Sequence, residues 1–144
     1  MNGNRTFTMI KPLTVQQGHT GKILDRILEE GFRITALKMV RMNREEAEAF
    51  YRIHQGKPFF TTLVDYMTSG PVVAAILEKE NAVTAYRDLI GATDPAKAAP
   101  GTIRNLFATD LTRNAVHGSD SDENALVESK FFFSSLEEIR LPKE

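Results

Sequence analysis

The chain has 144 residues, of which 42% are apolar and 26% are charged, proportions that are normal for a globular protein. We expect residues 1–144 to form a single domain, because this length suits one hydrophobic core. The formal net charge of −1 at pH 7 argues against a broad basic face for nucleic acid, but is compatible with a local basic pocket. The absence of cysteine excludes disulfides, thiolate catalysis and cysteine-based zinc sites.

No N-terminal stretch has the apolar length of a signal peptide, and no window approaches the roughly 18 consecutive apolar residues of a membrane span. We therefore expect a soluble, cytoplasmic protein without a membrane partner.

Hydrophobic periodicity and breaker residues predict alternating strands and helices. Residues 20–30 place apolar side chains at helical spacing and are followed by Gly31, whereas residues 72–78 form a nearly continuous apolar run of strand length. Asn43 followed by Glu46 has the pattern of a capping box. The expected strands cover 6–10, 33–41, 72–78 and 115–118, and the expected helices cover 20–30, 43–54, 59–68, 81–90 and the segment after 120 or 121.

Residues 92–113 have weak periodicity and contain Pro95, Pro100 and Gly101, which predicts one long irregular loop. A loop of that length in a compact domain is usually functional or held by a partner. The order of elements favours an α+β fold of the ferredoxin-like kind. This is a split β-α-β sandwich in which helices cover a four-stranded antiparallel sheet.

The common phosphate-binding motifs are absent. Residues 18–22, Gly-His-Thr-Gly-Lys, look like the end of a P-loop, but that motif needs glycine at Gln16 and Ser or Thr at Ile23. We interpret residues 18–22 as a helix start. The histidines are few and scattered, which argues against a zinc site built from His19, His54 and His117.

Residues 113–121, Arg-Asn-Ala-Val-His-Gly-Ser-Asp-Ser, concentrate reactive and hydrogen-bonding groups. Gly118 leaves room for a ligand beside His117, and the following helix places Glu128 about two turns in. A carboxylate on one imidazole nitrogen fixes the tautomer and leaves the other nitrogen free as a nucleophile. From these residues alone, a structural histidine in a polar turn is the simpler interpretation and stays open.

Other residues favour a phosphate site. Phosphoryl transfer needs positive charge around the transferring oxygens, and arginine suits planar phosphate contacts. Cationic side chains near turns or element ends are Lys11, Arg87, Arg104 and Arg113, the last of which we assign a structural role. Hydrogen-bonding groups for phosphate or sugar, and an aromatic face for a base, are offered by Thr93, Asn114 and Phe59.

The sequence resembles the nucleoside diphosphate kinase family. Residues 114–121, Asn-Ala-Val-His-Gly-Ser-Asp-Ser, match the motif around that family's phosphorylated histidine. The match continues in the family's order through TMIKP at 8–12, YRIHQGKPFF at 51–60, SGP at 69–71, GATDP at 91–95 and PGTIR at 100–104. Several separate motifs in one order are more specific than any single motif, and these extend over nearly the whole chain.

The resemblance implies a role for each matching position. His117 would be the phosphorylated nucleophile, Glu128 its orienting carboxylate, Ser119 a support for Glu128, and Tyr51 a neighbour of His117. The phosphates and sugar would be bound by Lys11, Arg87, Thr93, Arg104 and Asn114, with His54 close to the phosphates. Phe59 would stack on the base beside Leu63, and Asp120 would approach the metal through water.

The implied activity transfers the γ-phosphate of a nucleoside triphosphate to a nucleoside diphosphate through a phosphohistidine, in a ping-pong reaction with little base specificity that maintains nucleoside triphosphate pools. The implied cofactor is Mg²⁺, held mainly by the nucleotide. A homo-oligomer, hexamer or tetramer, is implied, and nucleic acid is not expected as a partner. The alternatives are a nucleotide-binding regulatory protein without turnover and a protein-histidine phosphotransferase.

The chain departs from the family pattern outside these positions. Asn105 and Leu106 stand where Gly-Asp is common, and Asp94 stands where Asn is frequent. Residues 129–133 read Ser-Lys-Phe-Phe-Phe in place of an Ile-Ala-Leu-Trp/Phe-Phe type of sequence. We expect these differences to affect subunit contacts, and therefore the choice between hexamer and tetramer.

Overall fold

The computed structural model describes residues 3–142, which form a four-stranded antiparallel sheet with the strand order β2-β3-β1-β4. The central strands are β1 (Arg5–Ile10) and β3 (Val72–Glu78), and the edge strands are β2 (Arg33–Val40) and β4 (Val116–Gly118). Because β3 lies between the consecutive strands β1 and β2, the β-α-β unit is split. The expected α+β, ferredoxin-like arrangement is confirmed.

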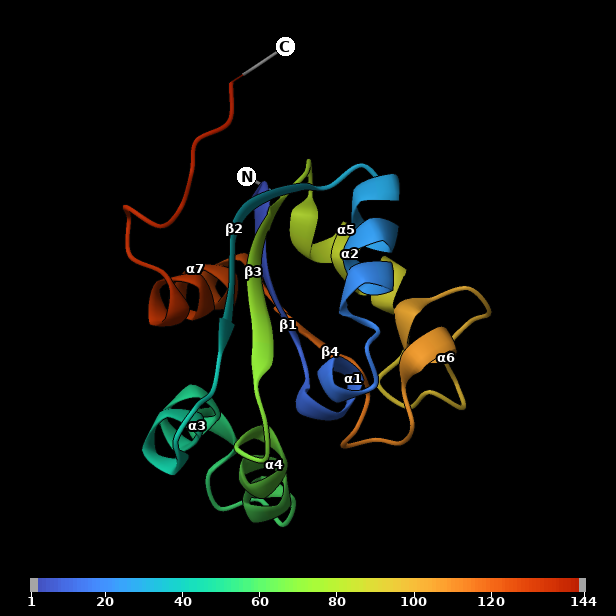
Figure 1. Ribbon diagram of the computed structural model, residues 1–144, viewed down its shortest axis with the longest axis vertical. Coiled ribbons are helices and arrows are strands. Elements are labelled where there is room, and N and C mark those ends of the chain that lie inside the picture. Colours follow the sequence, from blue (N-terminus) through green and yellow to red (C-terminus); the bar gives the residue numbers. More distant parts are fainter. Residues whose placement is uncertain (1–2, 143–144) are drawn as a thin grey trace.

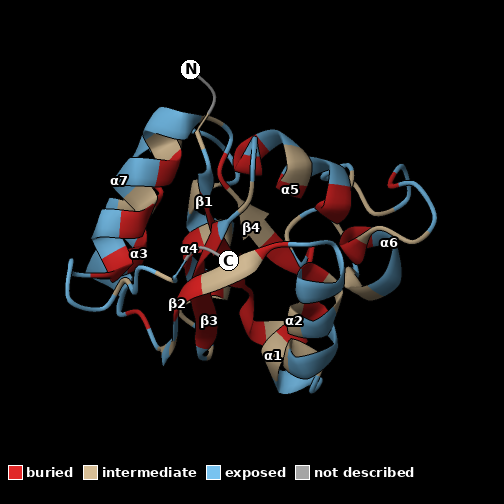
Figure 2. Ribbon diagram, turned by 90° about the horizontal axis from the view of Figure 1, so that it is seen from above, coloured by how far each residue is buried: buried red, intermediate tan, exposed pale blue. Residues whose placement is uncertain are grey.

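Helices cover both faces of the sheet (Figure 1). One face carries α2 (Thr20–Glu29) and α5 (Ala82–Ile90), and the other carries α7 (Asp122–Phe132). Figure 2 shows the buried residues on the strands and on the inward sides of these helices. The shorter helices are α1 (Pro12–Gln16), α3 (Arg44–Phe50), α4 (Phe60–Met67) and α6 (Ile103–Phe107), with a 3-10 turn at Arg52–His54.

Alternation along β1 divides the core between the two faces of the sheet. Phe7 and Met9 are buried in the cluster that also contains residues of α3, α4 and α7. Ile10 joins the cluster under α2 and α5, and the Thr8 hydroxyl lies 2.5 Å from the hydroxyl of Tyr86 in α5. Each β1 side chain therefore packs against the helices that cover its own face of the sheet.

The short strand β4 takes its orientation from β1. Met9 pairs with His117 and Thr8 pairs with Gly118, so His117 lies on the α7 face and Gly118 on the α5 face. A Cβ atom on Gly118 would lie only 3.0 Å from Ile90 Cδ1 and 3.1 Å from Tyr86 Cδ2. Glycine at this position lets β4 approach α5 closely.

Most expected elements are present, with local differences. The Asn43–Glu46 capping box is confirmed at the start of α3. The predicted helix over 43–54 is wrong in its second half, because α3 ends at Phe50 and the chain continues as the 3-10 turn. Asn81 occupies the N-cap position of α5 with a left-handed φ of 53° and makes no capping hydrogen bond.

Two short helices were not expected. Helix α1 begins at Pro12, because proline is tolerated at the first helical position, where its missing N–H is not needed. The long irregular loop expected over 92–113 contains the short helix α6, which was not predicted. Thr102 caps α6 by accepting a hydrogen bond from the Asn105 N–H, and five residues show too little periodicity to reveal a helix.

The C-terminal segment runs along the edge strand β2. The Ile139 N–H donates to the Thr35 carbonyl over 2.8 Å, and Glu137 forms an ion pair with Lys38 over 3.0 Å. These contacts cover part of the free edge of β2, as native sheets commonly require.

We expect Gly118→Ala to lower the free energy of unfolding by about 1–3 kcal/mol, because the new methyl group would overpack against α5. Gly21→Ala is the matched control, since no atom lies within 4 Å of its Cβ position in α2 and alanine favours the helix. Thermal unfolding at one protein concentration compares the two variants. An unchanged melting temperature for Gly118→Ala would contradict the close approach of β4 and α5.

Candidate active site

The residues expected at the site gather around one cavity of about 600 Å³. They come from the ends of β1 and β4, the 3-10 turn, and helices α4, α5, α6 and α7, so segments distant in sequence meet there. Ser119 is the exception, because it lies behind Glu128 and does not line the cavity. The expected residues that line the cavity are Lys11, Tyr51, His54, Phe59, Leu63, Arg87, Thr93, Arg104, Asn114, His117, Asp120 and Glu128.

His117 is held by a carboxylate through one ring nitrogen. Its Nε2 lies 2.9 Å from Glu128 Oε1, and Ser119 Oγ donates to the same oxygen over 2.6 Å. The backbone N–H of Phe7 donates to Ser119 Oγ over 3.3 Å, which anchors this group to β1. When Glu128 accepts the Nε2–H, the lone pair of the imidazole is left on Nδ1. Glu128 therefore lies against one ring nitrogen of His117, where the sequence predicts a carboxylate.

The main chain and ring of His117 are also restrained. Its carbonyl accepts a hydrogen bond from Thr8 Oγ1 over 2.9 Å. Its imidazole has aromatic neighbours, with ring centroids 5.4 Å away for Phe50 and 6.3 Å away for Tyr51. The imidazole of His117 is therefore held in one orientation by contacts from several elements.

Lys11 and Arg104 supply buried positive charge. They are only 6% and 8% exposed, respectively. Burial, with a smaller effect of the Arg104 guanidinium, lowers the pKa of Lys11 from 10.5 to about 7. Burial likewise lowers the pKa of Arg104 to about 10. An incoming phosphate would supply the negative charge that this end of the cavity lacks.

The Arg104 guanidinium joins two segments beside the cavity through three backbone carbonyls. It donates to the carbonyls of Gly91 (3.0 Å), Asn114 (3.3 Å) and Val116 (3.0 Å). These bonds tie the end of α5 to the chain leading into β4. Arg104 thus has a structural task that the sequence does not reveal, in addition to lining the cavity.

Two buried polar atoms at the cavity have no hydrogen-bond partner among the described residues: Tyr51 Oη and Asn114 Oδ1. Burial, reinforced by the charge of Glu128, raises the pKa of Tyr51, so its hydroxyl keeps its proton and stays a donor. Arg87 and Thr93 are exposed and add a cation and a hydroxyl to the wall. The cavity therefore offers donors and an acceptor to a polar ligand.

The other end of the cavity is aromatic and apolar. The ring of Phe59 is 46% exposed, and its centroid lies 5.2 Å from that of His54. Leu63, one helical turn further along, is half-buried beside it. Burial, and then the charge of Lys57, lower the pKa of His54. An exposed ring face of this kind suits a flat aromatic ligand.

Asp120 lies at the cavity wall just before α7. Its Oδ1 accepts a hydrogen bond from Asn124 Nδ2 over 2.6 Å, and Asn124 also lines the cavity. Asn124, in the first turn of α7, reaches back to Asp120, which lies two residues before that helix begins. The carboxylate is thereby oriented by a residue that the sequence did not single out.

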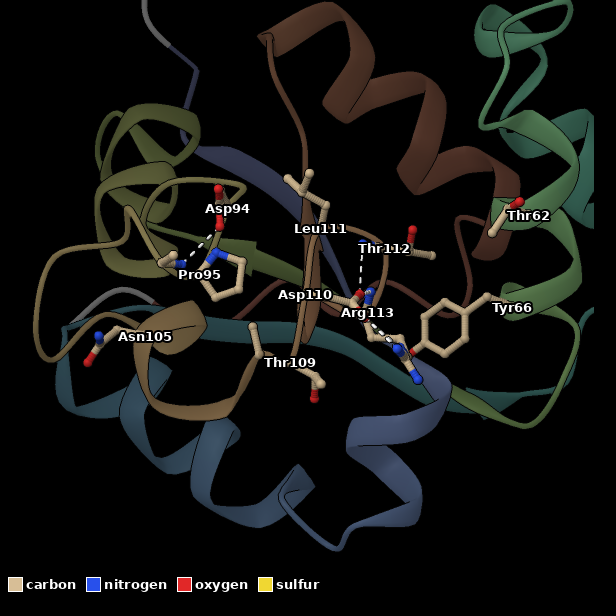
Figure 3. A pocket seen from close by; sticks show the side chains of 12 residues that line it. Thr62, Tyr66, Asp94, Pro95, Asn105, Thr109, Asp110, Leu111, Thr112 and Arg113 are labelled. Atoms are coloured by element: carbon tan, nitrogen blue, oxygen red, sulfur yellow. Dashed lines mark hydrogen bonds and ion pairs between the residues drawn. The ribbon is translucent and has the colours of Figure 1, made fainter.

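A second hollow, of about 1010 Å³, lies along the surface of the loop over 92–113 (Figure 3). It shares Leu111 and Thr112 with the first cavity. Two of its charged groups pair with each other, since Arg113 Nε donates to Asp110 Oδ2 over 2.9 Å. Arg113 thus holds the loop together, in keeping with a structural role, and His117 lies outside this hollow.

Comparison with known proteins identifies the family, since the sequence profile of nucleoside diphosphate kinase matches residues 4–138. The chain belongs to the nucleoside diphosphate kinase family. The nucleoside diphosphate kinase of Lawsonia intracellularis is 56% identical over 135 residues, which are 94% of this chain and 98% of that protein. That of Flavobacterium psychrophilum is 54% identical over 139 residues, 96% of this chain and 100% of that protein.

Solved structures agree with this assignment. The nucleoside diphosphate kinase of Aquifex aeolicus has a TM-score of 0.92 and 50% identity, and the match covers 94% of this chain and 99% of that one. A halophilic nucleoside diphosphate kinase from Halobacterium salinarum, solved in complex with CDP, has a TM-score of 0.93 and 39% identity, with 99% of this chain and 95% of that chain covered. The chain is thus an enzyme that transfers phosphate between nucleotides. Within residues 3–142, no helix has the length and apolar character required to cross a membrane.

Several residues of this kinase line the cavity without having been predicted. Asn124 follows Asp120 by one helical turn, a spacing that could have been noticed. Phe50 falls within the helix expected over 43–54, and it is half-buried and lines the cavity. No local pattern marks the remaining ones, because Ile53 lies in the short 3-10 turn and Leu111 and Thr112 lie in irregular chain.

We expect Lys11→Met to stabilise the nucleotide-free kinase while weakening nucleotide binding. Below pH 7 the buried lysine is charged in both the folded and unfolded states, so its full desolvation cost opposes folding. As the pH rises toward 10.5 the folded form is already neutral and this cost shrinks. The gain should be about 1 kcal/mol or more at pH 6, because one pKa unit corresponds to about 1.4 kcal/mol, and smaller at pH 10.

The measurement is denaturant unfolding at both pH values, with Lys22→Met as control because Lys22 is exposed on α2. A gain of equal size at both pH values would show that the pKa of Lys11 is not depressed in the folded protein.

Proposed function

We propose that His117 carries the phosphoryl group between the two nucleotides, through its Nδ1. The observation that carries this proposal is the 2.9 Å contact between His117 Nε2 and Glu128, inside a cavity that also contains Lys11 and Arg104. Transfer through a covalent intermediate requires a nitrogen nucleophile with a fixed tautomer and with cations beside it. Glu128 and Ser119 act by orienting the ring, and Tyr51 acts as a neutral hydroxyl donor beside it.

In the first half-reaction the lone pair of Nδ1 attacks the γ-phosphorus of a nucleoside triphosphate, and the bond to the β–γ bridging oxygen breaks. The nucleoside diphosphate leaves with that electron pair. The imidazole, now bonded to phosphorus and still protonated at Nε2, is cationic, and the Glu128 carboxylate stabilises it. Lys11 and Arg104 neutralise charge on the phosphate oxygens.

In the second half-reaction another nucleoside diphosphate occupies the same cavity. Its terminal β-phosphate oxygen attacks the phosphorus, and the electron pair of the P–N bond returns to Nδ1. The other phosphate and sugar contacts in this proposal come from Arg87, Thr93, Asn114 and His54, which line the cavity. The CDP bound to the relative from Halobacterium salinarum supports a nucleoside diphosphate as ligand.

Low base specificity follows from the apolar end of the cavity. We propose that the base stacks on Phe59 beside Leu63, since the Phe59 ring is 46% exposed. Stacking tolerates every base, because each has a π-face. The kinase would thereby maintain the pools of several nucleoside triphosphates.

The proposed cofactor is Mg²⁺. In the described part of the chain, no group of three or more His, Asp or Glu side chains is placed to hold a metal ion. Mg²⁺ usually binds through one or two carboxylates together with substrate phosphates and waters. The donors present therefore fit an ion that arrives on the nucleotide, with Asp120 near it through water. When bound, the ion would neutralise charge on the phosphate oxygens.

We further propose that the protein is cytoplasmic and forms a homo-oligomer, a hexamer or a tetramer. Experiment can separate two other activities from phosphate transfer between nucleotides. A regulatory protein would bind nucleotide without forming phosphohistidine, and a protein-histidine phosphotransferase would pass its phosphate to proteins.

The first test of the proposal is labelling with Mg²⁺ and γ-labelled ATP. We expect acid-labile label on the unaltered protein, rapid loss of that label to added GDP, and no label on His117→Ala. His19→Ala is the matched control, because His19 packs against Phe107 and does not line the cavity. Label that stays on the protein after addition of GDP would argue for a different acceptor.

The second test concerns the base. Phe59→Ala should raise KM for ADP, GDP, CDP and UDP by similar factors, about 10-fold or more, since stacking contributes about 1–3 kcal/mol per base. Leu28→Ala, an exposed apolar residue on α2, should leave all four values unchanged. An effect confined to the purines would contradict simple stacking.

A further inference from the structure

Phe50, the last residue of α3, lies at the centre of an aromatic cluster that reaches His117. Its ring centroid is 5.4 Å from the imidazole with an interplanar angle of 73°, so the two rings meet edge to face. Phe50 is half-buried and lines the cavity. Four further rings lie around it at centroid distances of 4.9 to 5.9 Å: Tyr51, Phe131, Phe132 and Phe7.

A phosphohistidine formed at this position must survive while one nucleotide leaves and another binds. During that interval water can attack the phosphorus. The P–N bond then breaks, its electron pair returns to Nδ1, and both protons of the water leave on dihydrogen phosphate. The imidazolium becomes a neutral imidazole, and the nucleotide energy is lost. Enzymes suppress such side reactions by excluding water from the reactive group.

Each carboxylate near His117 is engaged through one of its oxygens. Glu128 Oε1 already accepts hydrogen bonds from His117 and Ser119. Asp120 Oδ1 is bonded to Asn124 over 2.6 Å. On the α3 side, the ring nearest the imidazole is the hydrocarbon ring of Phe50, at 5.4 Å against 6.3 Å for Tyr51, and it can neither orient a water nor accept its proton.

Resting on the proposed phosphohistidine, we propose that Phe50 is a positioning residue that holds the His117 ring and shields its phosphoryl group from water. The Phe131 ring packs on Phe50 at 5.4 Å and 70°, against the side chain that contacts His117. Phe131 therefore supports the shield from behind.

This contact gives a second role to the Phe-Phe-Phe run at residues 131–133, whose effect we expected at subunit contacts. Phe132 packs on Phe50 and, nearly parallel, on Phe7 at 5.2 Å. Phe131 is 42% exposed, so its substitution should disturb the hydrophobic core little.

The test uses the full-length protein, labelled with γ-labelled ATP and freed of nucleotide. Two first-order rate constants are measured on the same phosphoenzyme: loss of label to water without acceptor, and transfer to added GDP. The variants are Phe50→Leu, Phe50→Ala and Phe131→Leu, with Val127→Ala on the exposed side of α7 as control. A first-order rate constant does not depend on how much of the protein is active. If a substitution only reduced the fraction of folded protein, both rate constants would stay unchanged.

We expect hydrolysis to accelerate about 2- to 10-fold in Phe50→Leu and less in Phe131→Leu, the range that corresponds to one lost aromatic contact. Transfer to GDP should change less than hydrolysis, so the ratio of the two rates shifts toward water. Val127→Ala should behave as the unaltered protein.

Hydrolysis rates equal to those of the unaltered protein in both leucine variants would overturn the shielding role, even if Phe50→Ala fails to fold. Absence of label on the unaltered protein is a different outcome, because it would remove the phosphohistidine itself and with it both proposals.

Discussion

The pairing of β4 with β1 is the constraint on which the site depends. β4 contains only three residues, yet its register decides which face of the sheet receives His117. A slip of one residue would turn the imidazole toward α5 and away from Glu128. Two backbone hydrogen bonds just outside β4 hold its register. The Ser119 N–H donates to the Phe7 carbonyl over 3.2 Å, and the Lys11 N–H donates to the Ala115 carbonyl over 2.9 Å.

Elements with a strong local pattern could be predicted from the sequence, and those without one could not. The apolar run of β3 was predicted with its observed bounds, and the capping box of α3 was predicted from Asn43 and Glu46. α1 and α6 escaped prediction because each is one short turn whose start is set by Pro12 or Thr102.

The site was predicted largely through motifs of the family, and the cavity brings those residues together. What the sequence does not contain is how they are held. Three carbonyl contacts of Arg104 depend on the tertiary fold, and no spacing in the chain announces them. The same holds for Phe50, whose helix pattern indicates burial but not the neighbour that it meets. The roles of the site residues remain predictions for the experiments above.

Burial of Lys11 has a consequence for the proton balance of the enzyme. With a pKa of about 7 in the nucleotide-free protein, its amine is mostly neutral at pH 8. A phosphate beside the amine favours the charged form, so a nucleotide that binds there brings a proton from the solvent with it. Departure of the nucleotide returns that proton. Each catalytic cycle would therefore exchange protons with the medium, and nucleotide affinity would decline as the medium becomes more alkaline.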